Sequence, residues 1–318
     1  MKTHWIFIFV LLFGFGCQEE TTEIIPKPID TETNPPGDND DGGNDDDDDD
    51  DGGDDDDDEP GDPGDPVGAD NSNLLFGNPS DATPSASDEN NYLMDKNYYV
   101  MSYNRSRGIP NWVSWYLGPT SLGSTSRTDA YAEDTALPAG WFRATNSSYS
   151  NSGFTRGHNC PSGDRTASVS ANEATFLMTN MIPQSANNNN GLWNNLEVYA
   201  RNQVTAGNEV YVIMGNSGTG GTGTSGYAET IANGNITVPE FIWKVLVIIP
   251  NGDNDLSRVT ANTRVIAVIT PNVQSGLGSW QSYRVSVDAI ETLSGYDLLS
   301  ALPDDMETTL EQKVDTGS

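Results

Sequence analysis

Residues 153–165 read GFTRGHNCPSGDR. The glycines and the proline of this segment predict a sharply bent, exposed turn rather than conventional core packing. His158 lies at its centre, and the only other histidine of the chain is His4. A lone histidine is by default a structural or surface residue, but an imidazole that titrates near neutral pH also suits general acid–base catalysis. The motifs that follow decide how His158 is interpreted.

Two further motifs follow at short separation: residues 176–184 read FLMTNMIPQ, and residues 189–197 read NNGLWNNLE. Together with the tetrapeptide TRGH at residues 155–158, they resemble the DNA/RNA non-specific endonucleases of the ββα-metal, or His-Me finger, superfamily. That family's signature is Asp-Arg-Gly-His, then Asn-x-x-Pro-Gln, then Asn-x-Gly/Asn-x-Trp-x-x-Leu-Glu. The chain departs from this signature at its first position, where Thr155 stands in place of Asp. This position influences how the loop is held in place. Weaker matches lie at residues 99–117, 126–129, 238–244 and 288–295.

The resemblance implies an α+β fold with a central, mostly antiparallel sheet flanked by helices, and with a ββα-metal finger at the active site. Hydrophobic patterning also predicts interspersed strands and helices. A β-hairpin is predicted from the aromatic and β-branched residues of 97–103 and 112–117. Central strands are expected at residues 209–214, 241–249 and 264–269, and helices at residues 170–178, 191–204 and 306–314. The glycine-rich residues 215–224 lack a Gly-Lys-Ser/Thr ending and predict a flexible loop.

Hydrolysis of a phosphodiester requires a base, a metal that neutralises charge and donors to the phosphate. The resemblance assigns the base to His158 and the phosphate contacts to Arg127 and Arg156, whose forked donors suit a crowded anionic phosphorus. Asn180 resembles the family's asparagine beside the histidine, where its amide could orient the substrate or the imidazole. The alternative for Asn180 is a buried turn amide.

The resemblance also implies a metal site. Asn189 is the expected direct ligand of a hydrated Mg²⁺, with Mn²⁺ or Ca²⁺ as alternatives, and Glu197 is expected to hold metal-bound water. Eight residues are about two helical turns, so both side chains would share a helix face. The alternatives are helix capping by Asn189 and a surface ion pair between Glu197 and Arg201. Cys160 is interpreted as a packing residue, because no second histidine is available to activate it.

The formal charge of the chain is −32. Residues 38–65 contain 18 acidic residues and no basic ones, whereas residues 66–318 contain 24 acidic and 13 basic residues, a net charge of −11. A net-acidic body cannot bind nucleic acid through a broad basic surface. Binding of DNA and RNA would therefore depend on a local arginine cluster and a metal ion.

The chain begins with a Lys2-containing, apolar segment that ends at Gly16 and Cys17. We interpret residues 1–17 as a lipoprotein signal peptide and residues 18–70, rich in Asp, Gly and Pro, as a disordered acidic tether. Residues 71–318 are the expected endonuclease domain. A lipid on Cys17 would attach the exported protein to the membrane of the bacterial cell envelope. We expect the protein either to be exposed at the cell surface or to be released from it. Only Cys160 would then remain, so no intrachain disulfide is expected.

The expected function is a metal-dependent, sugar-non-specific endonuclease that cleaves DNA and RNA. A second hypothesis is a surface nucleic-acid-binding lipoprotein with weakened catalysis, which Thr155 and the acidic body favour. A third, an antibacterial toxin, is disfavoured by the anchor, which would tether the chain to its producer.

Overall fold

The computed structural model describes residues 70–317. The signal peptide, Cys17 and all of the acidic tether except Asp70 lie outside the described residues. No helix in the described part is long and apolar enough to cross a membrane. The expectations about export, lipidation and the tether therefore stay predictions.

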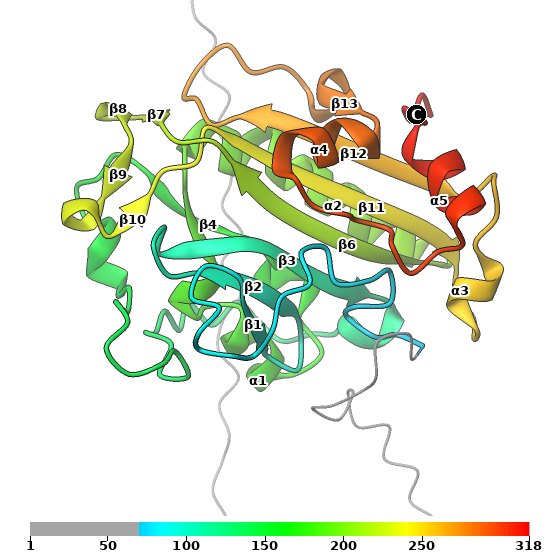
Figure 1. Cartoon of the computed structure of the whole chain (residues 1–318), viewed down its shortest axis with the longest axis horizontal. Helices are drawn as coiled ribbons and strands as arrows, with labels where there is room; N and C mark the ends of the chain where they lie inside the picture. The colour runs from blue at the N-terminus through cyan, green and yellow to red at the C-terminus, as the bar shows by residue number, and fades with distance from the viewer. Residues whose placement is uncertain (1–69, 318) are drawn as a thin grey trace, which may run out of the picture. The chain divides into compact units, whose positions relative to one another are not determined.

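A seven-stranded antiparallel sheet forms the centre of the described body (Figure 1). Its order is β1-β2-β3-β6-β11-β12-β13. The predicted hairpin is confirmed, because β2 and β3 are antiparallel neighbours with a register shift between Ser102 and Tyr103. The three predicted central strands are confirmed as β6, β11 and β12. The strands are β1 (Tyr92–Asp95), β2 (Val100–Asn104), β3 (Ile109–Leu117), β6 (Asn208–Ser217), β11 (Phe241–Pro250), β12 (Arg264–Pro271) and β13 (Arg284–Val285).

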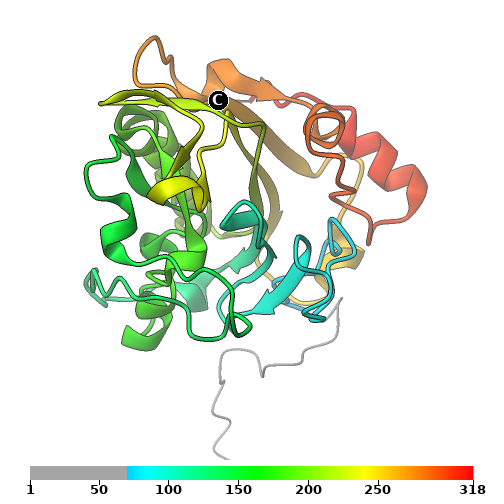
Figure 2. The same cartoon turned by 60° about the vertical axis from the view of Figure 1, so that its left-hand side comes forward.

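Both faces of the sheet are covered, which explains why its central strands are apolar almost without interruption. Successive strand residues point to opposite faces, so the central strands β3, β6, β11 and β12 contribute to two core clusters. One cluster joins the sheet to α2 (Asn194–Thr205) through Leu196 and Ala200. The other joins it to α4 (Val287–Ser294) and α5 (Asp304–Glu311) through Ile290 and Leu310. In Figure 2 the green segments and the orange-to-red helices lie on opposite sides of the sheet.

A small ββα unit carries the central motif. Strands β4 (Thr155–His158) and β5 (Met181–Gln184) form an antiparallel pair, and α2 follows β5 after a wide helical turn, η5 (Asn188–Trp193). Between β4 and β5 lie η3 (Ser162–Asp164), α1 (Val169–Ala174) and η4 (Met178–Asn180). The α+β fold and the ββα finger are therefore confirmed.

The boundaries of the three predicted helices need correction. Helix α1 ends at Ala174 rather than at Met178, because the Thr175 carbonyl accepts a hydrogen bond from Asn180 Nδ2 instead of continuing the helix. Regular helix α2 begins at Asn194 rather than at Gly191, whose φ of −101° and ψ of −108° are not helical. The third predicted helix, residues 306–314, is α5, which starts and ends earlier.

The glycine-rich segment is not one flexible loop. Its first residues extend β6 to Ser217, and Gly221–Gly223 form β7, which pairs with β8 (Gly226–Ala228). The remaining elements are the pair β9 (Thr230–Ile231) and β10 (Ile236–Thr237), the helix α3 (Asp255–Arg258), and the turns η1 (Pro119–Ser121), η2 (Asn146–Tyr149), η6 (Ala232–Gly234) and η7 (Trp280–Tyr283).

Candidate active site

His158 lies at the end of β4, where it pairs with Met181 of β5. Its side chain is buried, with 8% of the residue surface exposed, and its ring packs edge-on against Phe176 with the ring centroids 4.9 Å apart. Among the described residues, no group hydrogen-bonds to its Nε2 atom. His158 nevertheless lines a cavity of about 850 Å³. An imidazole that borders a polar cavity can accept a proton from a molecule bound there.

The protonation state of His158 is set by its surroundings. Burial, followed by the positive charge of Arg127, lowers the pKa of His158 to about 3. The ring is therefore neutral near pH 7, which is the form that a general base requires. A bound phosphate would bring negative charge close to Arg127 and so raise this pKa toward the range in which imidazole accepts protons efficiently.

Asn189 lines the same cavity from η5 and is oriented by Thr155. Its amide Nδ2 donates a hydrogen bond of 3.1 Å to the Thr155 hydroxyl, which in turn donates one of 2.9 Å to the main-chain oxygen of Gln184. The hydrogen bonds of the Asn189 side chain within the described body involve Nδ2 alone, so Oδ1 is left for another ligand. Thr155, the departure from the family signature, thus braces the asparagine from β4.

The neighbouring asparagines differ in burial and bonding. Asn188 is fully buried: its Nδ2 donates to Thr270 and Pro271, and its Oδ1 accepts a bond from Gln184. Asn190 is exposed at the edge of the cavity. The side chain of Asn189 caps no helix, since neither η5 nor α2 has a side-chain cap among the residues described. These observations favour the metal-ligand interpretation of Asn189 over helix capping.

Glu197 lines the same cavity from α2. Its Oε1 atom lies 3.4 Å from Nζ of Lys244, which is almost fully buried on β11. The Lys244 ammonium also lies over the rings of Trp115 and Trp193, at 5.4 and 4.8 Å from their centroids. Burial raises the pKa of Glu197 and Lys244 opposes this rise, so the lysine favours the ionised carboxylate. The suggested ion pair of Glu197 with Arg201 is wrong, because each residue has a different partner.

Three arginines line the cavity: Arg127, Arg156 and Arg201. Arg127 is held by Asp129, Ser162 and Tyr131 and stacks on Phe176 at 4.7 Å. Arg156 stacks on Tyr131 at 4.4 Å and has no salt bridge among the described residues. Arg127 and Arg156, the two predicted phosphate contacts, therefore line the same cavity.

Arg201 and Lys244 were not predicted as site residues. Arg201 pairs at 2.8 Å with Asp164, a buried carboxylate that also accepts a bond from the Trp115 indole. The signal for Lys244 is its position as a single charge within the apolar run FIWKVLVII. A charged residue at the centre of a buried strand requires a partner, and here that partner is Glu197.

Asn180 does not line the cavity, which corrects its assignment as a catalytic contact. It is fully buried, its Oδ1 accepts a bond from the Cys160 amide, and its Nδ2 donates to the carbonyls of Cys160 and Thr175. Asn180 is therefore the buried turn amide, and it positions His158 only through the loop that follows β4. Burial raises the pKa of the Cys160 thiol to about 12, which is consistent with a packing residue.

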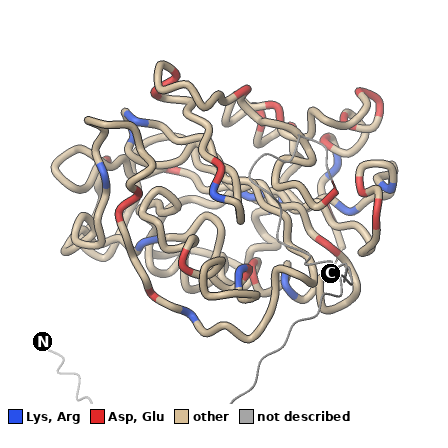
Figure 3. The backbone as a smooth tube through the Cα atoms, turned by 90° about the horizontal axis from the view of Figure 1, so that it is seen from below, with Lys and Arg blue, Asp and Glu red and all other residues tan. Residues whose placement is uncertain are grey.

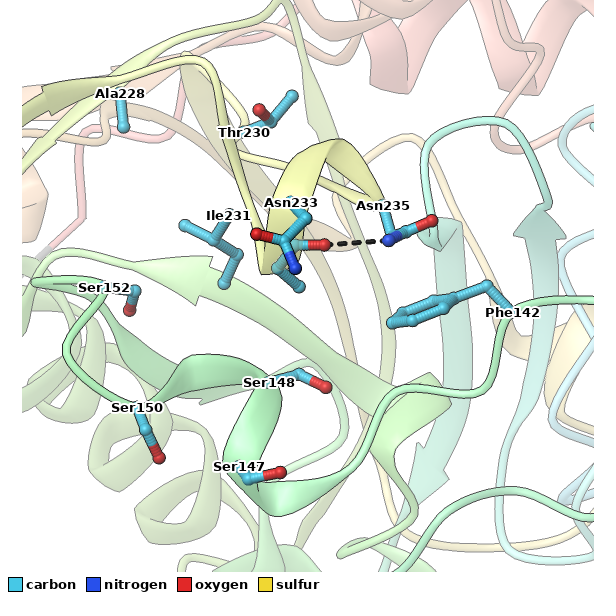
Figure 4. A pocket seen from close by; sticks show the side chains of 11 residues that line it. Phe142, Ser147, Ser148, Ser150, Ser152, Ala228, Thr230, Ile231, Asn233 and Asn235 are labelled. Carbon is cyan, nitrogen blue, oxygen red and sulfur yellow. Dashed lines mark hydrogen bonds between the residues drawn. The ribbon is translucent and has the colours of Figure 1, made fainter.

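A second cavity of about 500 Å³ lies between η2 and the β8–β10 segment (Figure 4). Serine and asparagine side chains and Phe142 line it, and none of its eleven lining residues is ionisable. Figure 3 shows basic and acidic residues interspersed along the described backbone. Of the two cavities, the one that contains His158 and the arginines holds the groups that phosphodiester hydrolysis requires.

The donor set of the larger cavity fits a hydrated divalent cation. Mg²⁺ prefers oxygen ligands and keeps several waters, so one amide oxygen and one carboxylate suffice to hold it. Asn189 offers the uncommitted Oδ1 atom, and Glu197 lines the same cavity. The residues present therefore fit the expected metal.

Comparison with known proteins agrees with this geometry. Residues 77–305 match the DNA/RNA non-specific endonuclease family. A nuclease from Nostoc sp. is 47% identical over 242 residues, which cover 76% of this chain and 85% of that protein. The mitochondrial nuclease EXOG of Danio rerio is 32% identical over 212 residues, covering 64% of this chain and 60% of that protein.

A solved structure, the EndoG/EndoGI complex, contains a chain with the same fold. The TM-score is 0.60 at 22% identity, and the match covers 74% of this chain and 92% of that one. The family match extends over most of the described body and includes every residue of the cavity. The chain belongs to the DNA/RNA non-specific endonuclease family and is a hydrolytic nuclease.

Proposed function

We propose that this nuclease hydrolyses phosphodiester bonds in both DNA and RNA, with His158 as the general base and Mg²⁺ as the metal. The proposal rests above all on the neutral imidazole of His158, which lines one cavity together with Asn189 and three arginines. Base, metal ligand and phosphate donors are the three components that the reaction needs.

In the proposed reaction, the imidazole of His158 takes a proton from a water molecule. The water oxygen forms a bond to phosphorus as the bond to the leaving oxygen breaks, and that oxygen is then protonated from solvent. Arg127 and Arg156 donate hydrogen bonds to the phosphate oxygens, with Arg201 as a third donor. Asn189 and Glu197 would hold Mg²⁺, with Mn²⁺ or Ca²⁺ as alternatives, and the bound ion would neutralise charge on the leaving oxygen.

The lack of preference between DNA and RNA follows from which part of the substrate is contacted. The proposed contacts are to backbone phosphate, which carries no sequence information and is common to both nucleic acids. Since residues 66–318 have a net charge of −11, affinity would depend on the local arginines and the metal.

The test is digestion of plasmid DNA and of RNA by the wild type, Asn189→Ala and Asn190→Ala, each with Mg²⁺ or with EDTA. We expect the wild type and Asn190→Ala to cleave both substrates only with Mg²⁺. Asn189→Ala should cleave both DNA and RNA much more slowly than the wild type does. Binding without cleavage by the wild type would instead support the hypothesis of a surface nucleic-acid-binding lipoprotein. Cleavage that survives EDTA would overturn the metal dependence.

We also propose that the protein is exported and anchored at the bacterial cell envelope by a lipid on Cys17. The support is the sequence of residues 1–17, and the acidic tether would hold the nuclease away from the membrane by charge repulsion. Cys17→Ser should abolish lipid labelling and release the protein from the membrane fraction. Unchanged membrane fractionation would contradict the anchor.

A further inference from the structure

Five carboxylates converge on the face of the sheet opposite the catalytic cavity. Asp288 and Glu291 belong to α4, Glu307 and Glu311 belong to α5, and Asp297 lies on the segment between the helices. They form two groups of three that share Glu311, and in each group the candidate ligand oxygens lie within 4.8 Å of one another. Residues 285–312 contain seven acidic residues and no basic ones.

Glu311 provides a second, independent observation. Its residue surface is only 7% exposed, and its Oε1 atom is buried without a hydrogen-bond partner among the described residues. Oε1 of Glu307 is likewise buried and unpartnered. A buried carboxylate oxygen without a partner costs free energy unless a ligand satisfies it.

No basic side chain offsets this charge within the described body. Arg284 pairs with Asp315, and Nζ of Lys313 donates to the carbonyl of Ala261. Glu307 and Glu311 have the spacing at which like charges destabilise a helix. The cluster is therefore unfavourable as it stands.

We propose that these carboxylates form a structural Ca²⁺ site centred on Glu311 that fastens α4 and α5 to the sheet. Ca²⁺ takes 6–8 oxygen ligands at about 2.3–2.6 Å, so oxygens on opposite sides of one ion are separated by roughly 5 Å, in keeping with the observed groups. Mg²⁺ takes fewer protein ligands and demands stricter geometry. The site is separate from the catalytic metal site, because Ile290 and Leu310 pack against the other face of the sheet.

The test measures thermal unfolding of the full chain in an Asn189→Ala background, which removes the catalytic metal ligand. With Ca²⁺ at about a hundred times its dissociation constant, the unfolding temperature should rise by about 5–10 °C over the EDTA-treated sample. Glu311→Gln should fold, because it removes repulsion, and should lose this rise. Asp305→Asn, an exposed acidic residue of α5 outside both groups, is the matched control and should keep it.

Calorimetric titration should find one more Ca²⁺ bound to the Asn189→Ala chain than to the Asn189→Ala/Glu311→Gln chain. Diffuse binding to the acidic tether cancels in this comparison, because both chains carry the tether. Glu307→Gln is a second variant that should lose the rise. An equal rise in Glu311→Gln, or no rise in the parent, would overturn the site, and an equal response to Mg²⁺ would overturn its assignment to Ca²⁺.

Discussion

Asn189 donates a hydrogen bond to the hydroxyl of Thr155 across 3.1 Å, which links the expected metal ligand to the one position where this chain departs from the family signature. Threonine can accept from the amide and still donate its own proton to the Gln184 carbonyl. The amide oxygen of Asn189 is thereby left for the metal.

Thr155→Val keeps the shape of the side chain but removes both hydrogen bonds. We expect the Mg²⁺ concentration needed for half-maximal cleavage to rise by about tenfold, since groups that orient a metal ligand typically contribute that much. Thr155→Ser should restore the wild-type requirement. The measurement is the initial rate of cleavage as a function of Mg²⁺ concentration. If Thr155→Val needed the same Mg²⁺ concentration for half-maximal cleavage as the wild type, Asn189 would be oriented by other contacts.

Lys244→Met removes the ammonium beside Glu197 while keeping an apolar side chain between the tryptophans. Since burial already raises the pKa of Glu197, loss of the lysine should raise it further and leave part of the carboxyl protonated near neutral pH. The apparent affinity for Mg²⁺ should fall by about tenfold at pH 7 and recover at higher pH. A metal affinity independent of pH in this variant would argue against the pairing.

Asn188 and Asn189 should give opposite results when each is replaced by alanine. Asn188→Ala removes three buried hydrogen bonds and should lower the free energy of unfolding by about 2–3 kcal/mol. Asn189→Ala, with one hydrogen bond at the edge of the cavity, should fold with near-normal stability but lose cleavage. Denaturant unfolding and plasmid digestion distinguish the two. If Asn188 were the residue essential for cleavage in a stable protein, the metal site would have to be reassigned.

Stability should depend on pH through His158. Its folded pKa of about 3 lies below the ordinary value of 6.5, so the unfolded chain binds the proton more readily. The contribution of neutral His158 is complete above pH 6.5 and is lost as the pH falls toward 3. Between pH 7 and pH 5 the wild type should lose about 2 kcal/mol more than His158→Ala, measured in EDTA by denaturant unfolding. Equal losses would mean that His158 is protonated in the folded protein.

The sequence predicted those parts of the site that lie within single motifs. His158 and Arg156 are two residues apart on one strand, and Asn189 and Glu197 are eight residues apart across the junction of η5 and α2, so the members of each pair are close in the sequence. Lys244 was missed because it lies 47 residues from Glu197 in the sequence, and only the folded structure brings the two side chains together. Asn180 was misassigned because a motif does not show whether its amide points to the cavity or to main-chain carbonyls.

The fold, too, could be predicted only where a local sequence pattern determines the structure. The central strands were predictable because both of their faces are buried, which leaves long apolar runs such as residues 241–249. The start of α2 was not, since a glycine can adopt helical or non-helical backbone angles and the sequence does not show that Gly191 is non-helical. The carboxylate cluster on α4 and α5 joins residues up to 23 positions apart, and no single motif contains it.

The central claim, that His158 is the general base, is tested most directly by the rate at which His158→Ala cleaves plasmid DNA at saturating Mg²⁺. Circular dichroism and unfolding curves would first establish that the variant is folded. We expect a loss of at least about a hundredfold, because the variant lacks the imidazole that takes the proton from water. A folded His158→Ala protein that cleaves at close to the wild-type rate would contradict it.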